Sequence, residues 1–379
     1  MDFADSLEHE AFRRVVRDFA EAEIAPFSEA WDRTETFPVE AVRRMGELGL
    51  FGLIFPEEYG GAGADLTTLC IAIEEIARVD SSVAITLEAG VGLGANPLYR
   101  FGTEAQKSRW LPDLVHGRRL AAFGLTEPDG GSDAADTRTK AERDGDEWVI
   151  NGAKAFITNS GTEITSLVMV TARTGPDAVS VLIVPAGTPG LVIEPGYRKM
   201  GWKASDTHGI RLEDCRVPAD HLLGPEGRGL RQFLSILDEG RIAIAALSVG
   251  VAAACLEYSV RYAEHRTAFG RPIGSNQGVA FPIADMRVAV EAARLLTQRA
   301  AWLRDTGREF RAAAAIAKLY ASEAAVAATR IATQVFGGAG FVDATPVSRF
   351  YRDAKVLEIG EGTSEIQRLV IARDLGLPV

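Results

Sequence analysis

The sequence predicts an α+β protein with three parts: an N-terminal α-helical domain over residues 1–121, a middle β-barrel or β-sandwich domain over 122–226, and a C-terminal four-helix bundle over 227–379. Three observations support this prediction. Apolar residues recur at helical spacing in the first 120 residues, short β-branched segments fill the middle, and long apolar stretches return after Gly229. A chain of 379 residues has room for two or three domains with ordinary cores.

The N-terminal part is expected to be helices joined by turns that Gly and Pro mark. Apolar side chains from Leu7 to Ile24 recur at helical spacing, and Pro26 follows as a stop. Further helices are expected over about 39–48, 67–79 and 81–99. The segment GVGLGA (90–95) matches a loose dinucleotide-binding fingerprint, but no buried strand precedes it. We therefore favour small residues that pack a helix over a nicotinamide site.

The middle domain is predicted from strand signals at close spacing. β-branched and aromatic residues gather in short segments over 148–150, 155–158, 167–171 and 179–184. Asn151-Gly152 is predicted to form a hairpin turn between the first two of these segments. Together they predict a compact barrel or sandwich of about 100 residues.

The C-terminal part is predicted to contain long helices. The first covers about 230–266 and is apolar on nearly every face between Ile242 and Cys255, which predicts burial inside a bundle or an oligomer core. A short last helix is expected from Ser364, which forms a capping-box pattern with Gln367. Between them, two more long helices are expected over about 281–305 and 311–335.

Composition and missing motifs exclude several function classes. A net charge of −11 argues against a nucleic-acid binder. The three cysteines are far apart and the five histidines have no zinc-ligand spacing, so we expect free thiols and no metal site. No phosphate loop or nucleophile elbow is present. The first ten residues are acidic, and the longest uncharged stretch (242–256) is too short for a bilayer, so a cytoplasmic protein without a membrane partner is expected.

Two motifs are candidate functional sites. The segment FGLTEPDGGSD (123–133) is a loop rich in hydroxyls, glycines and exposed amides, which can donate N–H groups to a heterocycle or a phosphate; alternatively, it is a surface turn. Glu361 lies between two glycines ahead of a predicted helix, where a ligand can approach the backbone. The alternative for Glu361 is a carboxylate that stabilises the helix dipole.

With four further segments, these motifs resemble the acyl-CoA dehydrogenase family over almost the whole chain. The segments that carry the resemblance occur in the expected order: FGLTEPDGGSD (123–133), NGAKAFITN (151–159), LDEGRIAIAA (237–246), YAEHRTAFGRPI (262–273), QVFGGAGF (334–341) and RFYRDAKVLEIGEGTSEIQRLVIAR (349–373). The family's helical, β and helical organisation agrees with the three predicted domains. The resemblance implies α,β-dehydrogenation of an acyl-CoA thioester with FAD as cofactor.

The resemblance also assigns roles to single residues. It implies that Glu361 is the catalytic base and that its backbone N–H helps to hold the thioester oxygen. Some members carry the base on the long helix, where this chain has Gly240, and Glu239 beside it is expected to face elsewhere. Substrate contacts are implied for Ser132, Asp238, Arg241 and Gly362, although Arg241 could equally be a structural ion-pair partner.

The cofactor site is implied to involve two subunits. The residues expected to line FAD within one chain are Phe123, Leu125, Thr126, Gly131, Ser132, Phe156, Thr158, Thr363 and Glu365; Phe156 stands where many members have Trp, and β-domain core is its alternative. Those expected to reach the FAD of a neighbouring subunit are Arg266, Phe269, Gln277, Gln334, Gly337 and Gly338. Such contacts imply a homo-oligomer, usually a tetramer, with electrons leaving to an electron-transfer flavoprotein.

The expected substrate is a short or branched acyl-CoA. Gly360 stands where many straight-chain members have Tyr, and the absent ring opens space for a branched group. A glutaryl-type substrate is not expected, because Ala84 stands where those members have a carboxylate-binding Arg, and Glu88 would repel an anionic tail if it faced the pocket. The alternatives left open are an oxidase that reduces oxygen directly, a flavin-bearing scaffold without turnover and a nicotinamide enzyme.

Overall fold

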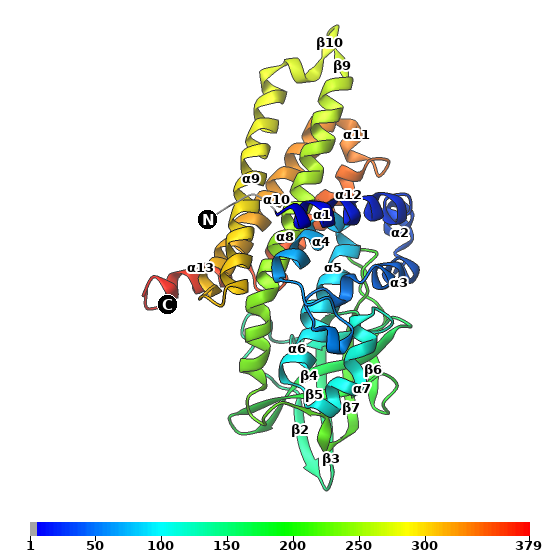
Figure 1. Ribbon diagram of the computed structural model, residues 1–379, viewed down its shortest axis with the longest axis vertical. Helices are drawn as coiled ribbons and strands as arrows, with labels where there is room; N and C mark the ends of the chain where they lie inside the picture. Colours follow the sequence, from blue (N-terminus) through cyan, green and yellow to red (C-terminus); the bar gives the residue numbers. More distant parts are fainter. Residues whose placement is uncertain (1–5) are drawn as a thin grey trace.

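A computed structural model describes residues 6–379 and shows helical N- and C-terminal parts with a sheet domain between them in sequence (Figure 1). The predicted fold class is therefore confirmed. Long helices form one end of an elongated molecule and the sheet forms the other (Figure 1). The sheet strands run from Leu120 to Leu223. The domain limits at 121/122 and 226/227 stay predictions.

From residue 6 onward, the N-terminal part contains seven α-helices: α1 (Leu7–Phe19), α2 (Ser28–Thr34), α3 (Val39–Glu47), α4 (Leu66–Ala77), α5 (Ser81–Glu88), α6 (Asn96–Phe101) and α7 (Glu104–Val115). Ser6 is the N-cap of α1, and its hydroxyl accepts a hydrogen bond from the His9 amide. The expected helix over 81–99 consists of α5, the π-helical segment η4 (Ala89–Ala95) and α6. Helices α2 and α7 were not placed from the sequence.

The glycines of η4 serve helix packing. A Cβ atom at Gly90 would lie 2.6 Å from the Phe51 ring, and one at Gly94 would lie 2.8 Å from the Ala121 carbonyl oxygen. The segment follows a helix and continues into another, so it lacks the strand that a dinucleotide-binding turn requires. The structure thus supports the packing interpretation of this motif.

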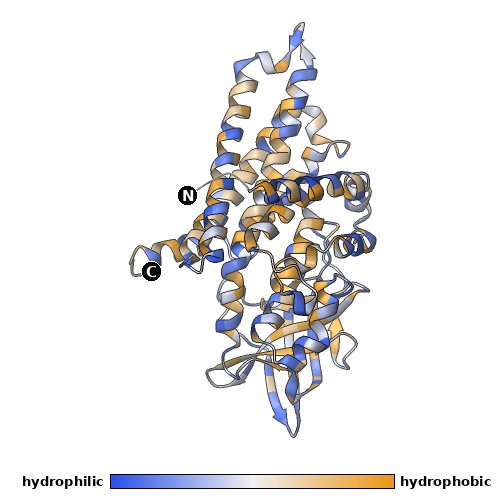
Figure 2. Cartoon of the chain, viewed as in Figure 1, coloured by the Kyte–Doolittle hydropathy of each residue, from blue (hydrophilic) through white to orange (hydrophobic). Residues whose placement is uncertain are grey.

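The middle domain is an eight-stranded sheet. Its strand order is β6-β7-β3-β2-β4-β5-β8, and β1 pairs with β4 in parallel. The strands are β1 (Leu120–Gly124), β2 (Lys140–Asp144), β3 (Glu147–Thr158), β4 (Thr165–Gly175), β5 (Ala178–Pro185), β6 (Leu191–Ile193), β7 (Thr207–Pro218) and β8 (Leu222–Leu223). The tip of the β2–β3 hairpin is hydrophilic and lies at the end of the molecule (Figure 2).

The predicted hairpin turn at Asn151-Gly152 is wrong. Both residues lie inside β3, where the pairing with β7 shifts register and forms a bulge. Asn151 exchanges side-chain hydrogen bonds with Asp214 on β7, and a Cβ atom at Gly152 would lie 2.5 Å from the Thr139 hydroxyl oxygen. The Asn-Gly pair therefore permits a close strand approach, and the real turn is at Gly145 between β2 and β3.

Two hydrophobic cores follow from the alternation of side chains along the strands. On β4, Leu167 and Met169 belong to the large core that runs through the N-terminal helices and the bundle. Val168 and Val170, which point to the opposite face, belong to a smaller core within the sheet domain. The sheet is therefore anchored to the helices by one of its faces.

The C-terminal part contains three long helices, α8 (Gly229–His265), α9 (Gln277–Asp305) and α10 (Arg311–Phe336). The hairpin of β9 (Thr267–Ala268) and β10 (Arg271–Pro272) joins α8 to α9, and short helices follow: α11 (Gly338–Phe341), α12 (Pro346–Ala354) and α13 (Ser364–Asp374). Helix α8 contains an 18-residue window apolar enough for a bilayer, but 89% of that window is buried inside the fold. Such burial is the pattern of a core helix.

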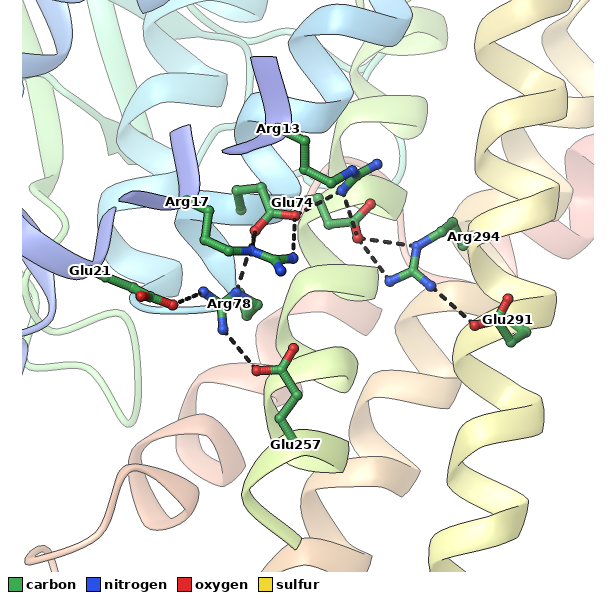
Figure 3. A network of polar contacts seen from close by, with 9 residues as sticks. Arg13, Arg17, Glu21, Glu74, Arg78, Glu257, Glu291 and Arg294 are labelled. Atoms are coloured by element: carbon green, nitrogen blue, oxygen red, sulfur yellow. Dashed lines mark hydrogen bonds and ion pairs between the residues drawn. The ribbon is translucent and has the colours of Figure 1, made fainter. Parts of the chain in front are cut away.

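Ion pairs attach α1 to the rest of the molecule (Figure 3). Arg13 contacts Glu75 at 2.8 Å and Glu74 at 3.2 Å, and Arg17 donates to Glu75 at 2.8 Å. Burial opposes ionisation of Glu75, but the hydrogen bonds from Arg17 and Arg13 outweigh it and lower its pKa. Arg294 of α9 contacts Glu74 from the other side at 2.8 Å, so these contacts join α1, α4 and α9.

Candidate active site

Glu361 lies in the loop between the 3-10 segment Lys355–Glu358 and α13. Its φ is +52° and that of Gly362 is +97°, so consecutive residues adopt the left-handed region. Such a conformation costs about 1–3 kcal/mol in a non-glycine residue and is found at functional sites. Both carboxyl oxygens of Glu361 are buried without a hydrogen-bond partner, and burial raises its pKa. A carboxylate with a raised pKa is a stronger base than one in water.

Helix α8 approaches Glu361 at Gly240. A Cβ atom at Gly240 would lie 2.1 Å from Glu361 Oε2. The two positions at which the family resemblance places a base therefore share one region of space. Glu239 points away, as expected, because its carboxylate contacts Arg100 at 3.1 Å and Arg304 at 3.2 Å.

A second carboxyl group, that of Glu88 at the end of α5, lies beside Glu361. Glu88 is fully buried and neither of its oxygens has a hydrogen-bond partner. Burial and then the charge of Glu361 raise its pKa well above the usual range. The Cβ position of Gly240 lies 3.7 Å from Glu88 Oε1. The sequence did not predict that the two carboxyl groups meet.

Two buried cations, Lys318 and Arg241, lower the pKa of Glu361 and so oppose the effect of burial. Lys318 Nζ donates a hydrogen bond of 2.7 Å to the Gly362 carbonyl oxygen, and burial lowers the pKa of Lys318 to about 8. Arg241 pairs with Asp238 at 2.5 Å, which is the structural role considered for it. Asp238, Arg241 and Gly362 thus gather around Glu361. Lys318 was missed, although a lone lysine among alanines was a usable signal.

The buried carboxylate of Glu127 holds the loop after β1 in a defined conformation. The carboxylate of Glu127 accepts hydrogen bonds from the amides of Arg138 and Thr139 and from Lys154 Nζ at 2.7 Å. The Phe123 ring stacks on Phe233 with centroids 3.7 Å apart. The remaining predicted residues of this loop are half-buried or exposed: Leu125, Thr126, Gly131 and Ser132.

Strand β3 brings Phe156 and Thr158 next to this loop. The Ala155 amide donates a hydrogen bond of 2.9 Å to the Thr126 carbonyl oxygen, so loop and strand lie side by side. Phe156 has a φ of +60° and is 66% exposed, with its ring 5.1 Å from that of Tyr197. It is not a core residue, so the alternative of β-domain packing for Phe156 is wrong.

The residues expected to reach a neighbouring subunit lie elsewhere. Arg266 and Phe269 are at the β9–β10 hairpin, at the end of the molecule opposite the sheet (Figure 1). Phe269 is 101% exposed. The rings of Tyr262 and Phe336 stack at 4.1 Å and bring the end of α10 to the same region, which also holds Gln277, Gln334, Gly337 and Gly338. One chain does not bring these residues to the loop after β1.

The cap of α13 differs from the predicted one. Thr363 is the N-cap, and its hydroxyl accepts a hydrogen bond from the Ile366 amide at 3.3 Å, so a capping box of Ser364 and Gln367 is wrong. Gln367 Nε2 instead donates to the Gly362 carbonyl oxygen at 2.9 Å. This bond ties the helix to the loop of the candidate base. Glu365 lies exposed in the first turn.

The residues present fit a flavin dinucleotide. A Cβ atom at Gly131 would meet nothing closer than 4.0 Å, which leaves this loop backbone open to a ligand. The hydroxyls of Thr126 and Ser132 offer donors to a heterocycle, and the exposed Phe156 ring offers an apolar face. The exposed guanidinium of Arg266 suits a pyrophosphate.

Comparisons with known proteins identify the family of the chain. Sequence models of the acyl-CoA dehydrogenase N-terminal, middle and C-terminal domains match residues 6–118, 122–215 and 227–376. The chain is 50% identical to the probable acyl-CoA dehydrogenase YngJ of Bacillus subtilis over 99% of this chain and 100% of that protein. It is 44% identical to the mouse mitochondrial short-chain specific acyl-CoA dehydrogenase, over 97% and 90%.

Among solved structures, butyryl-CoA dehydrogenase from Megasphaera elsdenii superposes with a TM-score of 0.96 and 40% identity, over 99% of this chain and 100% of the other. The three-domain fold, the three matching family models and these relatives define a flavoprotein oxidoreductase. The chain belongs to the acyl-CoA dehydrogenase family.

Proposed function

We propose that this protein catalyses FAD-dependent α,β-dehydrogenation of a short or branched acyl-CoA thioester to the trans-2-enoyl-CoA, with Glu361 as the base. The observation that carries the proposal is the Glu361 carboxyl, buried and without a partner next to Gly240. A carboxylate in this environment is a stronger base than one in water, because burial raises its pKa.

Removal of the α-proton requires a base and stabilisation of the enolate-like charge that develops on the thioester oxygen. Glu361 accepts the α-proton at a carboxyl oxygen, and its backbone N–H binds the thioester oxygen. The glycines on both sides keep this N–H open to the substrate. The chemistry that bound FAD would supply is acceptance of the hydride from the β-carbon.

The chain's own residues would hold the cofactor in two groups. The loop after β1 and the exposed part of β3 would contact the flavin through Thr126, Ser132, Phe156 and Thr158. Arg266 and Phe269, at the other end of the molecule, would contact the FAD of a second subunit, because they lie far from the loop in one chain. We therefore propose a homo-oligomer, a tetramer by family resemblance, and an electron-transfer flavoprotein as electron acceptor.

The preference for short or branched groups rests on the residues beside the base. Gly360 carries no ring, and a Cβ atom there would meet nothing closer than the Val356 carbonyl oxygen at 3.5 Å, so there is space for a branch. Ala84 offers no cation to an acyl carboxylate, and the nearby carboxyl of Glu88 opposes one. The butyryl-CoA and short-chain specific relatives support the same size range.

An anaerobic titration of the purified protein with acyl-CoAs tests the proposal through the visible flavin band. Butyryl-, isobutyryl-, 2-methylbutyryl- or isovaleryl-CoA should bleach the band, and the order of rates ranks the substrates. A stable band with every thioester would overturn the substrate assignment, and a protein that neither contains nor rebinds FAD would overturn the reaction. Peroxide formed under air at the rate of turnover would indicate an oxidase.

A further inference from the structure

Glu88 is an unusual carboxyl group in this fold. Among residues 6–379, only Glu88 and Glu361 have both carboxyl oxygens buried without a hydrogen-bond partner. The side chain of Glu88 is 0% exposed, at the junction of α5 and the π-helical segment η4. Interruptions of this kind in α-helices are frequent at functional sites.

Other buried carboxylates have partners that explain their burial. Glu75 is bonded to Arg13 and Arg17, and Glu127 is bonded to Lys154. Asp353 accepts hydrogen bonds from the Ser81 hydroxyl and the Trp202 amide. Glu88 has no such partner, so its carboxyl group contributes no ion pair or cap to the fold.

Glu88 lies beside the candidate base Glu361. Its Oε1 lies 3.7 Å from the point where a Cβ atom of Gly240 would stand, and Glu361 Oε2 lies 2.1 Å from the same point. A Cβ atom at Gly92 would lie 2.9 Å from Glu88 Oε1. Two glycines thus leave the two carboxyl groups side by side, so a substrate whose α-carbon reaches Glu361 passes Glu88 with its next few carbons.

We propose that Glu88 is a specificity-determining residue that binds a hydrogen-bond donor, a hydroxyl or an ammonium group, on the acyl chain of the thioester. The proposal rests on the function proposed above and names its substrate class: short acyl groups with a donor a few bonds beyond the α-carbon. C4 is the first such position, because C3 carries the hydride that leaves.

A donor on the acyl chain is favoured because of what happens to the Glu88 carboxyl group when substrate binds. In the free protein, the charged group that acts on Glu88 is Glu361, whose negative charge adds to burial in raising the pKa of Glu88, and no hydrogen bond satisfies either Glu88 oxygen. Glu361 must turn to the α-carbon during the reaction, so an aliphatic chain leaves Glu88 buried and unpaired. A donor on the chain satisfies it, and sites built in this way discriminate strongly against analogues that lack the donor.

The test compares 4-hydroxybutyryl-CoA with pentanoyl-CoA, in which a methyl group replaces the hydroxyl at nearly equal size. Wild-type protein should show a kcat/KM at least about tenfold higher for the hydroxylated thioester. Glu88→Ala should lose this preference or reverse it, and Glu88→Gln, which keeps an acceptor oxygen, should retain part of it. Calorimetric binding of the two enoyl-CoA products, which do not turn over, should follow the same order.

Each protein serves as its own fold control, because the preference is a ratio and flavin content is measured in parallel. Thr86→Val is the matched control on α5, since the Thr86 hydroxyl bonds only to the Ser82 carbonyl oxygen, and its ratio should equal that of wild type. Equal kcat/KM for both thioesters, unchanged in Glu88→Ala, would overturn this proposal and leave the proposed function intact. If neither thioester bleaches the flavin while butyryl-CoA does, this proposal fails alone; if butyryl-CoA and the branched thioesters also leave the band unchanged, the proposed function fails as well.

Discussion

The ammonium group of Lys318 donates a hydrogen bond of 2.7 Å to the carbonyl oxygen of Gly362, one residue beyond the candidate base Glu361. The lysine belongs to α10 and is 0% exposed. It therefore acts on the base in two ways: it holds the left-handed loop in place, and its charge lowers the pKa of Glu361.

Replacement of Lys318 by Met should weaken both effects. The pKa of Glu361 should rise, because a cation that lowers it is removed, and the acidic limb of the kcat/KM profile should move to higher pH. Measurement of kcat/KM between pH 5 and 9 checks this. Lys355→Met is the control, since Lys355 is exposed and pairs with Glu358; an identical shift in both variants would contradict the role of Lys318.

Glu361→Gln should keep FAD and bind acyl-CoA but lose turnover by about 10²–10⁴-fold, the usual contribution of a general base. The amide has nearly the same shape and cannot take the α-proton. Anaerobic stopped-flow reduction of the flavin by butyryl-CoA measures the effect. Glu358→Gln, in the same loop region, is the control, and near-normal reduction in Glu361→Gln would disprove the assignment.

Gly240→Ala should place a methyl group where Glu361 Oε2 now lies, because the added Cβ would be 2.1 Å from that oxygen. The carboxyl end of a flexible side chain can move, so the protein should still fold with FAD. A base displaced by about 1 Å is expected to cost roughly 10²-fold in kcat. Gly175→Ala, where the nearest contact is an ordinary 3.4 Å, should leave kcat unchanged. Unaltered kcat in Gly240→Ala would show that Glu361 works from another position.

Lys154→Met should destabilise the protein by about 3 kcal/mol, the usual result of leaving one member of a buried ion pair. Lys154 and Glu127 pair at 2.7 Å, and Glu127 also holds the loop after β1. Chemical denaturation gives the free energy of unfolding, and FAD retention on gel filtration should fall in parallel. Adding Glu127→Gln should recover part of the stability; a double variant no better than the single one would show that the two groups act independently.

The sequence predicted elements better than it predicted contacts. The helical spacing before residue 120 and after Gly229 indicated the right class of structure, because that pattern is local. The hairpin turn predicted at Asn151-Gly152 was wrong, because a residue pair that suits a tight turn also suits a bulge where β3 lies close to β7 and β2. The choice depends on neighbouring strands that the local sequence does not contain.

In the candidate site too, contacts between distant segments could not be predicted from the sequence. The glycines around Glu361 indicated a functional loop, and the family resemblance named its role. The meeting of Glu88 with Glu361 depends on how α5 packs against α8 and the last loop, so no spacing along the chain predicts it. Lys318 reaches Gly362 for the same reason, through the packing of α10.

The ion-pair network around Glu75 and the apolar core of the bundle attach their helices in two different ways, which respond oppositely to salt. Helix α1 is held by the ion pairs of Arg13 and Arg17 and by the packing of Val16, Phe12 and Phe19, whereas α8 is surrounded by apolar side chains. Dissolved ions screen attraction between charges, and strongly hydrated salts strengthen apolar burial. As the concentration of such a salt rises, the ion pairs that hold α1 weaken while the apolar packing of the bundle becomes more stable. Helix α1 is therefore the part of this molecule that high ionic strength destabilises first.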